Sequence, residues 1–141
     1  MLLRDLRIRD VFVLPCPKSS AITCTGVPTR TPGTVPASDS TLTSLRTLST
    51  QSPFPAFRRA PGFWADRHFW APEVHVYRGR YYMLASFKSA DRCRGTQVLT
   101  AEHPKGPFVP VSDKPVTPGE WECLDGTLYE EDGQLYLSSA G

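Results

Sequence analysis

Residues 74–88, VHVYRGRYYMLASFK, decide the fold class. Alternating or aromatic residues lie on both sides of Arg78 and Gly79. This pattern is typical of a β-hairpin, whereas the apolar residues of a helix recur every three to four positions. The stretch therefore predicts two antiparallel strands joined by a tight turn at residues 78–79.

Short strands and turn signals continue on both sides of this hairpin. On the N-terminal side of the hairpin, Pro15 ends an apolar, β-branched run. On the C-terminal side, turn residues occur at positions 104–107 and 132–133. Turns recur every 8–12 residues, and no stretch has helical periodicity. The pattern predicts an all-β architecture and leaves a sandwich, a barrel and a propeller open. Further strands are expected at residues 6–15, 96–103, 108–113, 124–131 and 134–139.

Composition divides the chain into three parts. Residues 1–15 hold the first expected strand, and residues 53–141 hold 14 of the chain's 15 aromatic residues. Residues 16–52 contain 20 Ser, Thr or Pro among 37 positions and no Phe, Trp or Tyr. Because this segment cannot offset its ordering entropy by burial, it is predicted to be disordered, unless it is a frame-shifted stretch, as considered below.

Charge and cysteine usage exclude several classes of function. A net charge of +2 does not favour nucleic acid as a partner, and no apolar run approaches the ~20 residues of a membrane span. The start alternates charge with Leu and Ile, so no signal peptide is seen and a cytoplasmic location is the default expectation. Neither the four scattered cysteines nor the three histidines have metal-ligand spacing. We therefore expect no metal and no cofactor.

The strongest chemical cluster is GFWADRHFWAPEVHVY, residues 62–77. It places Trp64 and Trp70 close in sequence to the carboxylate of Glu73. Aromatic faces beside carboxylates suit a sugar site, because a sugar C–H face stacks on indole while acids and bases bind its hydroxyls. The alternative is that these aromatic residues are ordinary core of a β-rich domain.

Three acidic residues lie at strand starts or turns that would hold them in place. Asp10 precedes the apolar run VFVLP, Glu73 follows Pro72, and Asp125 lies between Leu124 and Gly126. Hydrolysis of a glycosidic bond needs one carboxyl group as acid and a second as base or nucleophile. A third carboxylate can raise the pKa of the acid by like-charge repulsion. For each residue the alternative is a solvated turn acid.

Four segments together resemble glycoside hydrolase family 43, the arabinofuranosidases and xylosidases. In order and spacing they are IRDVFVLP, FWAPEVHVYRGRYYMLASF, RGTQVLTAEHPKGPFVPVSDKPVTP and WECLDGTLYEEDGQLYL. The resemblance implies a five-bladed β-propeller with its site at the central funnel. A chain of this length would hold about two to three blades, so the resemblance implies an incomplete propeller, truncated at its C-terminus.

The resemblance also implies roles for the matching residues. Asp10 would be the general base of an inverting hydrolase, with Val11 in place of the family's proline. Asp125 would tune the pKa of the acid, while Glu73, Trp70 and Trp64 would contact the sugar. The general acid, a Glu, is expected beyond Gly141, so this chain is expected to be a nearly inactive fragment.

The implied activity is hydrolysis of O-glycosyl bonds in carbohydrate metabolism. The expected partner is an oligo- or polysaccharide that contains α-L-arabinofuranosides or β-D-xylosides. A non-catalytic carbohydrate-binding propeller is the alternative from a different class, and a downstream Glu in the encoding locus would discriminate against it.

The composition of residues 16–52 can be explained by a shifted reading frame. Residues 22–26, ITCTG, can be encoded so that a start at the third base reads Tyr-Leu-Tyr-Gly. Residues 39–48, DSTLTSLRTL, allow a second aromatic-containing reading with the same offset. Such aromatic strands are what the family carries here. A genuine insert is the alternative.

Overall fold

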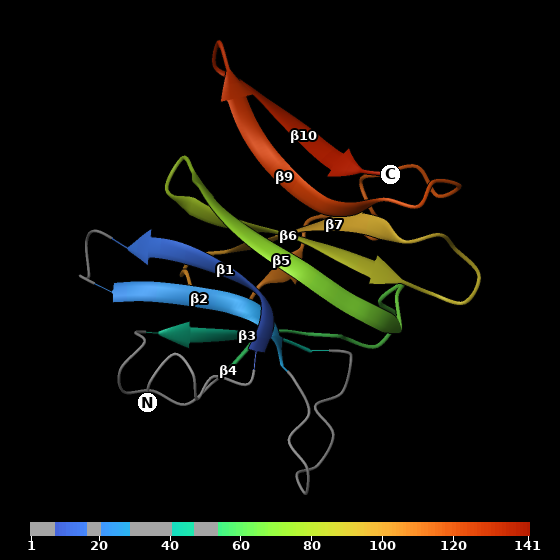
Figure 1. Cartoon of the computed structure of the whole chain (residues 1–141), viewed down its shortest axis with the longest axis horizontal. Coiled ribbons are helices and arrows are strands. Elements are labelled where there is room, and N and C mark those ends of the chain that lie inside the picture. The colour runs from blue at the N-terminus through green and yellow to red at the C-terminus, as the bar shows by residue number, and fades with distance from the viewer. Residues whose placement is uncertain (1–7, 17–20, 29–40, 47–53) are drawn as a thin grey trace, which may run out of the picture.

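Ten strands in three antiparallel sheets make up the described part of the protein. The computed structural model describes residues 8–16, 21–28, 41–46 and 54–141, and the side chains of residues 12–15 and 55–141. No helix occurs in those ranges, and therefore none that has the length and hydropathy to cross a bilayer. The all-β prediction is confirmed (Figure 1).

The first sheet has the strand order β1-β2-β3-β4. Two of its strands lie inside the Ser/Thr/Pro-rich segment, so the structure differs there from the expected disorder. Strand β2 contains the β-branched residues Ile22, Thr23, Thr25 and Val27, which favour a strand. Its backbone pairs with β1, and this pairing cannot be predicted from the local sequence. The frame-shift hypothesis stays a prediction, and residues 17–20, 29–40 and 47–52 lie outside the described residues. The strands are β1 (Ile8–Cys16), β2 (Ala21–Pro28), β3 (Thr41–Arg46) and β4 (Phe54–Arg58).

The second sheet contains the predicted hairpin and has the order β5-β6-β7-β8. Arg78 and Gly79 both have positive φ, at 47° and 79°, as a type I′ turn between twisted strands requires. The hairpin prediction is confirmed. The strands are β5 (Arg67–Tyr77), β6 (Arg80–Lys88), β7 (Gly95–Ala101) and β8 (Val109–Pro110).

The third sheet is one hairpin of β9 (Leu124–Glu131) and β10 (Gln134–Ala140). Its turn repeats the geometry of the previous one, because Asp132 and Gly133 have φ values of 52° and 78°. The rings of Tyr129 and Tyr136 stack across the pair with centroids 5.2 Å apart. Both turn positions agree with the strands expected from the sequence.

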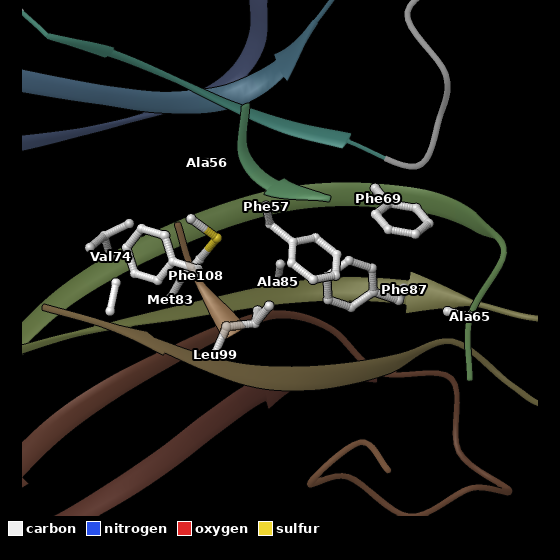
Figure 2. Packing of buried hydrophobic residues seen from close by; sticks show 11 residues of the cluster. Ala56, Phe57, Ala65, Phe69, Val74, Met83, Ala85, Phe87, Leu99 and Phe108 are labelled. Atoms are coloured by element: carbon white, nitrogen blue, oxygen red, sulfur yellow. The ribbon is translucent and has the colours of Figure 1, made fainter. Parts of the chain in front are cut away.

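A phenylalanine-rich core lies between the first and second sheets (Figure 2). Phe57 enters from β4 and meets Phe69 of β5 and Phe87 of β6, with ring centroids 6.0 and 5.7 Å from it. Aliphatic residues extend the cluster along the sheet, and Phe12 of β1 packs against it. The cluster therefore joins the two sheets. Its remaining buried members include Ala56, Ala65, Val74, Met83, Ala85, Leu99, Ala101 and Phe108.

The first strand of each sheet lies beside the first strand of the next. β1 contacts β5, and β5 contacts β9. In Figure 1 all three strands run toward the left, so each begins on its right-hand side. The starts of three strands that span more than 100 positions of the sequence therefore face the same way.

Candidate active site

Three of the five expected site residues lie near the N-terminal ends of three neighbouring strands, whereas Glu73 is in the middle of β5 and Trp64 precedes it. Asp10 is the third residue of β1, Trp70 the fourth of β5 and Asp125 the second of β9. Because β1, β5 and β9 are neighbours and run in the same direction (Figure 1), the three positions lie toward the same end of their strands. The side chain of Asp10 lies outside the described ones, so its role stays a prediction.

The backbone around Trp70 departs from a regular strand. The register of β5 against β6 shifts on both sides of Trp70, and the two non-glycine residues His68 and Ala71 have φ values of 54° and 46°. A bulge changes the direction in which the following side chain points. A left-handed conformation costs a non-glycine residue about 1–3 kcal/mol and recurs at ligand-binding positions.

The indole of Trp70 has a flat partner and a cationic one. The His68 ring stacks on it with centroids 4.4 Å apart and planes 11° apart, and the Arg94 guanidinium carbon lies 4.6 Å from its centroid. Arg94 Nη2 is also 3.2 Å from His68 Nδ1. Cation–π contact and stacking together fix the plane of a half-buried indole.

Glu122 binds the terminal nitrogen of Arg94 that does not contact His68. Its Oε2 atom is 3.0 Å from Arg94 Nη1, and its Oε1 atom accepts a hydrogen bond from Lys88. The hydrogen bond from Lys88 lowers the pKa of Glu122 below its ordinary value, and the nearby Arg94 acts in the same direction. The carboxylate therefore stays ionised and pairs with both Lys88 and Arg94.

Glu73 is part of a second polar cluster, which connects β5 with β9. Its Oε1 atom accepts a hydrogen bond from Thr127 Oγ1 at 2.5 Å and lies 2.7 Å from His75 Nε2. The Leu128 amide is 3.3 Å from the same His75 nitrogen. Because one ring nitrogen cannot donate and accept at once, the shorter contact favours an Nε2 proton directed at Glu73. Glu73 thus links β5 to β9.

Asp125 adopts a backbone conformation that few residues tolerate. Its φ is 53°, and its N–H donates to the hydroxyl of buried Ser86 at 3.2 Å, while its side chain is exposed. The next residue, Gly126, lies so close to β7 that an added Cβ would be 2.5 Å from Thr96 Cγ2. These contacts fix the backbone of residues 125–126 and thereby the position from which the Asp125 side chain starts.

Trp64 is placed differently from Trp70. Its indole N–H donates to the buried Gln97 side chain at 2.8 Å, and its ring packs against Phe63 and Phe87. Gln97 in turn donates to the Ser112 carbonyl at 3.0 Å. These are the contacts of a core residue. A direct sugar contact by Trp64 stays a prediction.

Arg94, Glu122 and Ser86 are functional candidates that the sequence does not single out. Arg94 lies 24 positions from Trp70, and nothing in the local pattern links the two residues. The available signal for Glu122 is its proximity to the LDG segment, residues 124–126. No group of three or more His, Cys, Asp or Glu that could hold a metal ion occurs among the described side chains.

The chain belongs to the glycosyl hydrolases family 43, whose profile matches residues 38–141. It is 28% identical over 78 residues to a beta-xylosidase of Xylanibacter ruminicola, an alignment that covers 55% of this chain and 24% of that protein. This match and the family profile together confirm the resemblance read from the sequence.

Solved structures of the same kind match nearly the whole chain. The endo-arabinase from Bacteroides thetaiotaomicron VPI-5482 has a TM-score of 0.80 at 32% identity and covers 97% of this chain and 46% of its own. A GH43_1 enzyme from Xanthomonas citri, in complex with xylotriose, has a TM-score of 0.68 at 22% identity over 94% of this chain and 40% of its own. The chain therefore spans about a quarter of the curated relative and less than half of these structures.

Proposed function

We propose that this chain carries the general base and the pKa-modulating carboxylate of an inverting glycoside hydrolase. Its substrates would be α-L-arabinofuranosides or β-D-xylosides of plant-type polysaccharides. The observation that carries the proposal is that the neighbouring strands β1, β5 and β9 run in the same direction, with Asp10, Trp70 and Asp125 each near the start of its strand.

The three sheets correspond in this proposal to successive blades of a five-bladed propeller. The sheets β1–β4 and β5–β8 would be four-stranded blades, and β9–β10 would begin a third. The propeller is supported by the family-43 structures that match 94–97% of this chain. The general acid, a Glu, would belong to a later blade.

In the reaction, Asp10 would take a proton from water as the water oxygen bonds to the anomeric carbon. The bond from that carbon to the leaving oxygen breaks on the opposite face, and the leaving oxygen takes a proton from the general acid. Asp125 would act by its negative charge, which raises the pKa of the general acid so that it stays protonated.

Sugar contacts would come mainly from the two polar and aromatic clusters described above. The Trp70 indole, whose plane is fixed by contacts with His68 and Arg94, offers a flat surface for a sugar C–H face. Glu73 would accept hydrogen bonds from sugar hydroxyls, and Trp64 would contribute an edge of its half-buried ring. The xylotriose complex of the Xanthomonas citri enzyme supports a pentose-containing oligosaccharide as ligand.

Activated aryl glycosides test the base without the acid. 4-Nitrophenyl α-L-arabinofuranoside and β-D-xyloside leave as a stabilised phenolate, so their hydrolysis depends little on protonation of the leaving group. We expect slow release of 4-nitrophenolate by the chain and its loss in Asp10→Asn. Asp125→Asn should retain this slow release, because the modulator would act on the general acid, on which the phenolate leaving group depends little, and Asn tolerates the positive φ of this position.

Calorimetric titration with xylobiose and arabinobiose separates the possible failures. Sugar binding without any aryl glycoside hydrolysis would favour a non-catalytic carbohydrate-binding propeller. Absence of both binding and hydrolysis in folded protein would overturn the proposal.

A further inference from the structure

Trp121 is the most exposed large hydrophobic side chain among the described residues, at 61%. It lies in the connection between β8 and β9, next in sequence to Glu122. Within the described part of the chain, no aromatic ring or cation contacts its indole. An exposed indole lacks the stabilisation that burial normally gives this side chain, so its exposure does not contribute to folding.

The backbone that carries Trp121 is anchored on both sides. Residues 116–123, which we call the tryptophan connection, are hydrogen-bonded both before and after Trp121 to residues 94 and 96 at the start of β7. The connection also closes on itself, because the Trp121 amide donates to the Pro118 carbonyl at 3.3 Å. The bonds to the β7 start are Val116 N to Thr96 O at 2.9 Å, Thr96 N to Thr117 Oγ1 at 3.1 Å and Cys123 N to Arg94 O at 2.9 Å.

The tryptophan connection is also linked to the candidate active site. Glu122, which follows Trp121, binds the Arg94 guanidinium that lies over the Trp70 ring. Asp125 is four residues further along the chain. In Figure 1 the orange connection that leads into β9 lies at the same right-hand end as the starts of β5 and β9.

We propose that Trp121 is an outer sugar-binding residue, which stacks on a saccharide unit of a bound oligosaccharide beyond the unit held at Trp70. This inference rests on the proposed function. Because the backbone is anchored, binding orders only the two side-chain torsions of Trp121, so little conformational entropy is lost, as a stacking surface requires. Its chain neighbours Glu120 and Glu122 are acidic and can accept hydrogen bonds from sugar hydroxyls, whereas charged neighbours disfavour an apolar protein partner.

Chain-length dependence of binding tests the inference. Calorimetric titrations of the protein would use xylobiose, xylohexaose, arabinobiose and arabinohexaose as probes. We expect Trp121→Ala to weaken binding of the preferred hexasaccharide roughly three- to ten-fold, the range of one aromatic contact. The affinity for the matching disaccharide should not change. Trp121→Phe should retain part of the hexasaccharide affinity.

Tyr136→Ala is the matched control, because Tyr136 is another exposed aromatic residue, located on β10. Its hexasaccharide affinity should equal that of the unmodified protein. Equal affinity of Trp121→Ala and the unmodified protein for the hexasaccharide would overturn the inference while disaccharide binding upholds the proposed function. Equal losses for di- and hexasaccharide would also overturn it, since Trp121 would then act on the central site. Absence of all sugar binding by the unmodified protein would instead overturn the proposed function.

Discussion

The middle sheet, β5–β8, has two faces that are built in different ways. Its face toward the first sheet is covered by aromatic rings, with Phe57, Phe63 and Phe69 around Phe87. Its face toward β9 has Ser86 and Thr96, which meet the backbone of Asp125 and Gly126. Both faces are closely packed, but the first buries large apolar side chains and the second brings two backbones together.

The difference separates stability from positioning. Burial of large apolar side chains contributes several kcal/mol per residue and tolerates small shifts of one sheet against the other. A hydroxyl-to-amide bond contributes only about 1 kcal/mol but fixes the place of one backbone atom. We therefore expect substitutions on the aromatic face to unfold the protein and substitutions on the polar face to misplace Asp125.

The largest effect is expected from Phe87→Ala, on the aromatic face. Phe87 is completely buried and contacts four rings, so the substitution should lower the free energy of unfolding by about 3–5 kcal/mol. Urea denaturation followed by circular dichroism measures it. Leu137→Ala is the control, because Leu137 is an exposed β10 residue and should change stability by less than about 1 kcal/mol. Equal losses in the two variants would contradict the assignment of the core.

The next effect is expected from Gly126→Ala, on the polar face. The added methyl group would overlap Thr96 Cγ2, so β9 must move away from β7 at a cost of about 1–3 kcal/mol. Thr96→Ala removes the obstructing atoms, and its own hydroxyl has no hydrogen-bond partner among the described residues.

The double variant Gly126→Ala with Thr96→Ala should therefore be more stable than the sum of the single losses. Urea denaturation of all four proteins gives this coupling. Additive losses would mean that the close approach of Gly126 to Thr96 does not determine the spacing of the two strands.

A smaller effect is expected from Ser86→Ala. The substitution removes the acceptor of the Asp125 amide at a cost of about 1 kcal/mol, which corresponds to roughly five-fold faster hydrogen exchange of that amide. Amide exchange followed by NMR measures it, with the Cys123 amide, which is bonded to Arg94 O, as internal control. Unchanged exchange at Asp125 would show that Ser86 does not fix this residue.

The smallest effect is the pH dependence of the Glu122 cluster. Lys88 keeps the pKa of Glu122 below the ordinary value of 4.5, so folding favours the ionised form. The resulting stabilisation is complete above that value and is lost as the pH falls through the lower pKa of the folded state. Because Glu122 is exposed, we expect a small change confined to its surroundings.

Near-ultraviolet circular dichroism between about pH 7 and pH 3 follows the tryptophan environment. We expect the acid transition to weaken in Glu122→Gln and to persist in Glu120→Gln, an exposed acid two residues away. Identical transitions in the two variants would contradict a role of Glu122 at Trp70.

The two hairpins could be predicted from the sequence because their signals are local. Alternation of period two and a glycine at the second turn position are sufficient for the pairs β5–β6 and β9–β10. The strands β2 and β3 could not be predicted, since their Ser- and Thr-rich composition is equally typical of a linker and their pairing depends on β1 and β4.

The candidate site was predictable in its segments but not in its contacts. The WAPE and LDG segments mark Trp70 and Asp125, yet the Arg94–Trp70 pair joins the residue before β7 to β5 and leaves no spacing signal. The positive φ values of His68 and Ala71 at the bulges could not be predicted either, because glycine is the residue that normally adopts this conformation. Trp64 and Trp70 are alike in sequence, and only tertiary packing distinguishes a core indole from one that contacts a cation and a histidine.

The strand order has a consequence for how the protein acquires its structure. Each of the described strands pairs with a strand that is next to it in the chain, so none of these three sheets needs a distant segment in order to form. Contacts between residues close in sequence form fast, and domains fold from the N-terminus during synthesis. Each sheet can therefore pair while the next is still being synthesised. The slow step would be the docking of finished sheets on one another, and a ribosome-bound chain that ends after β8 should already protect the amides of β6 and β7 from exchange.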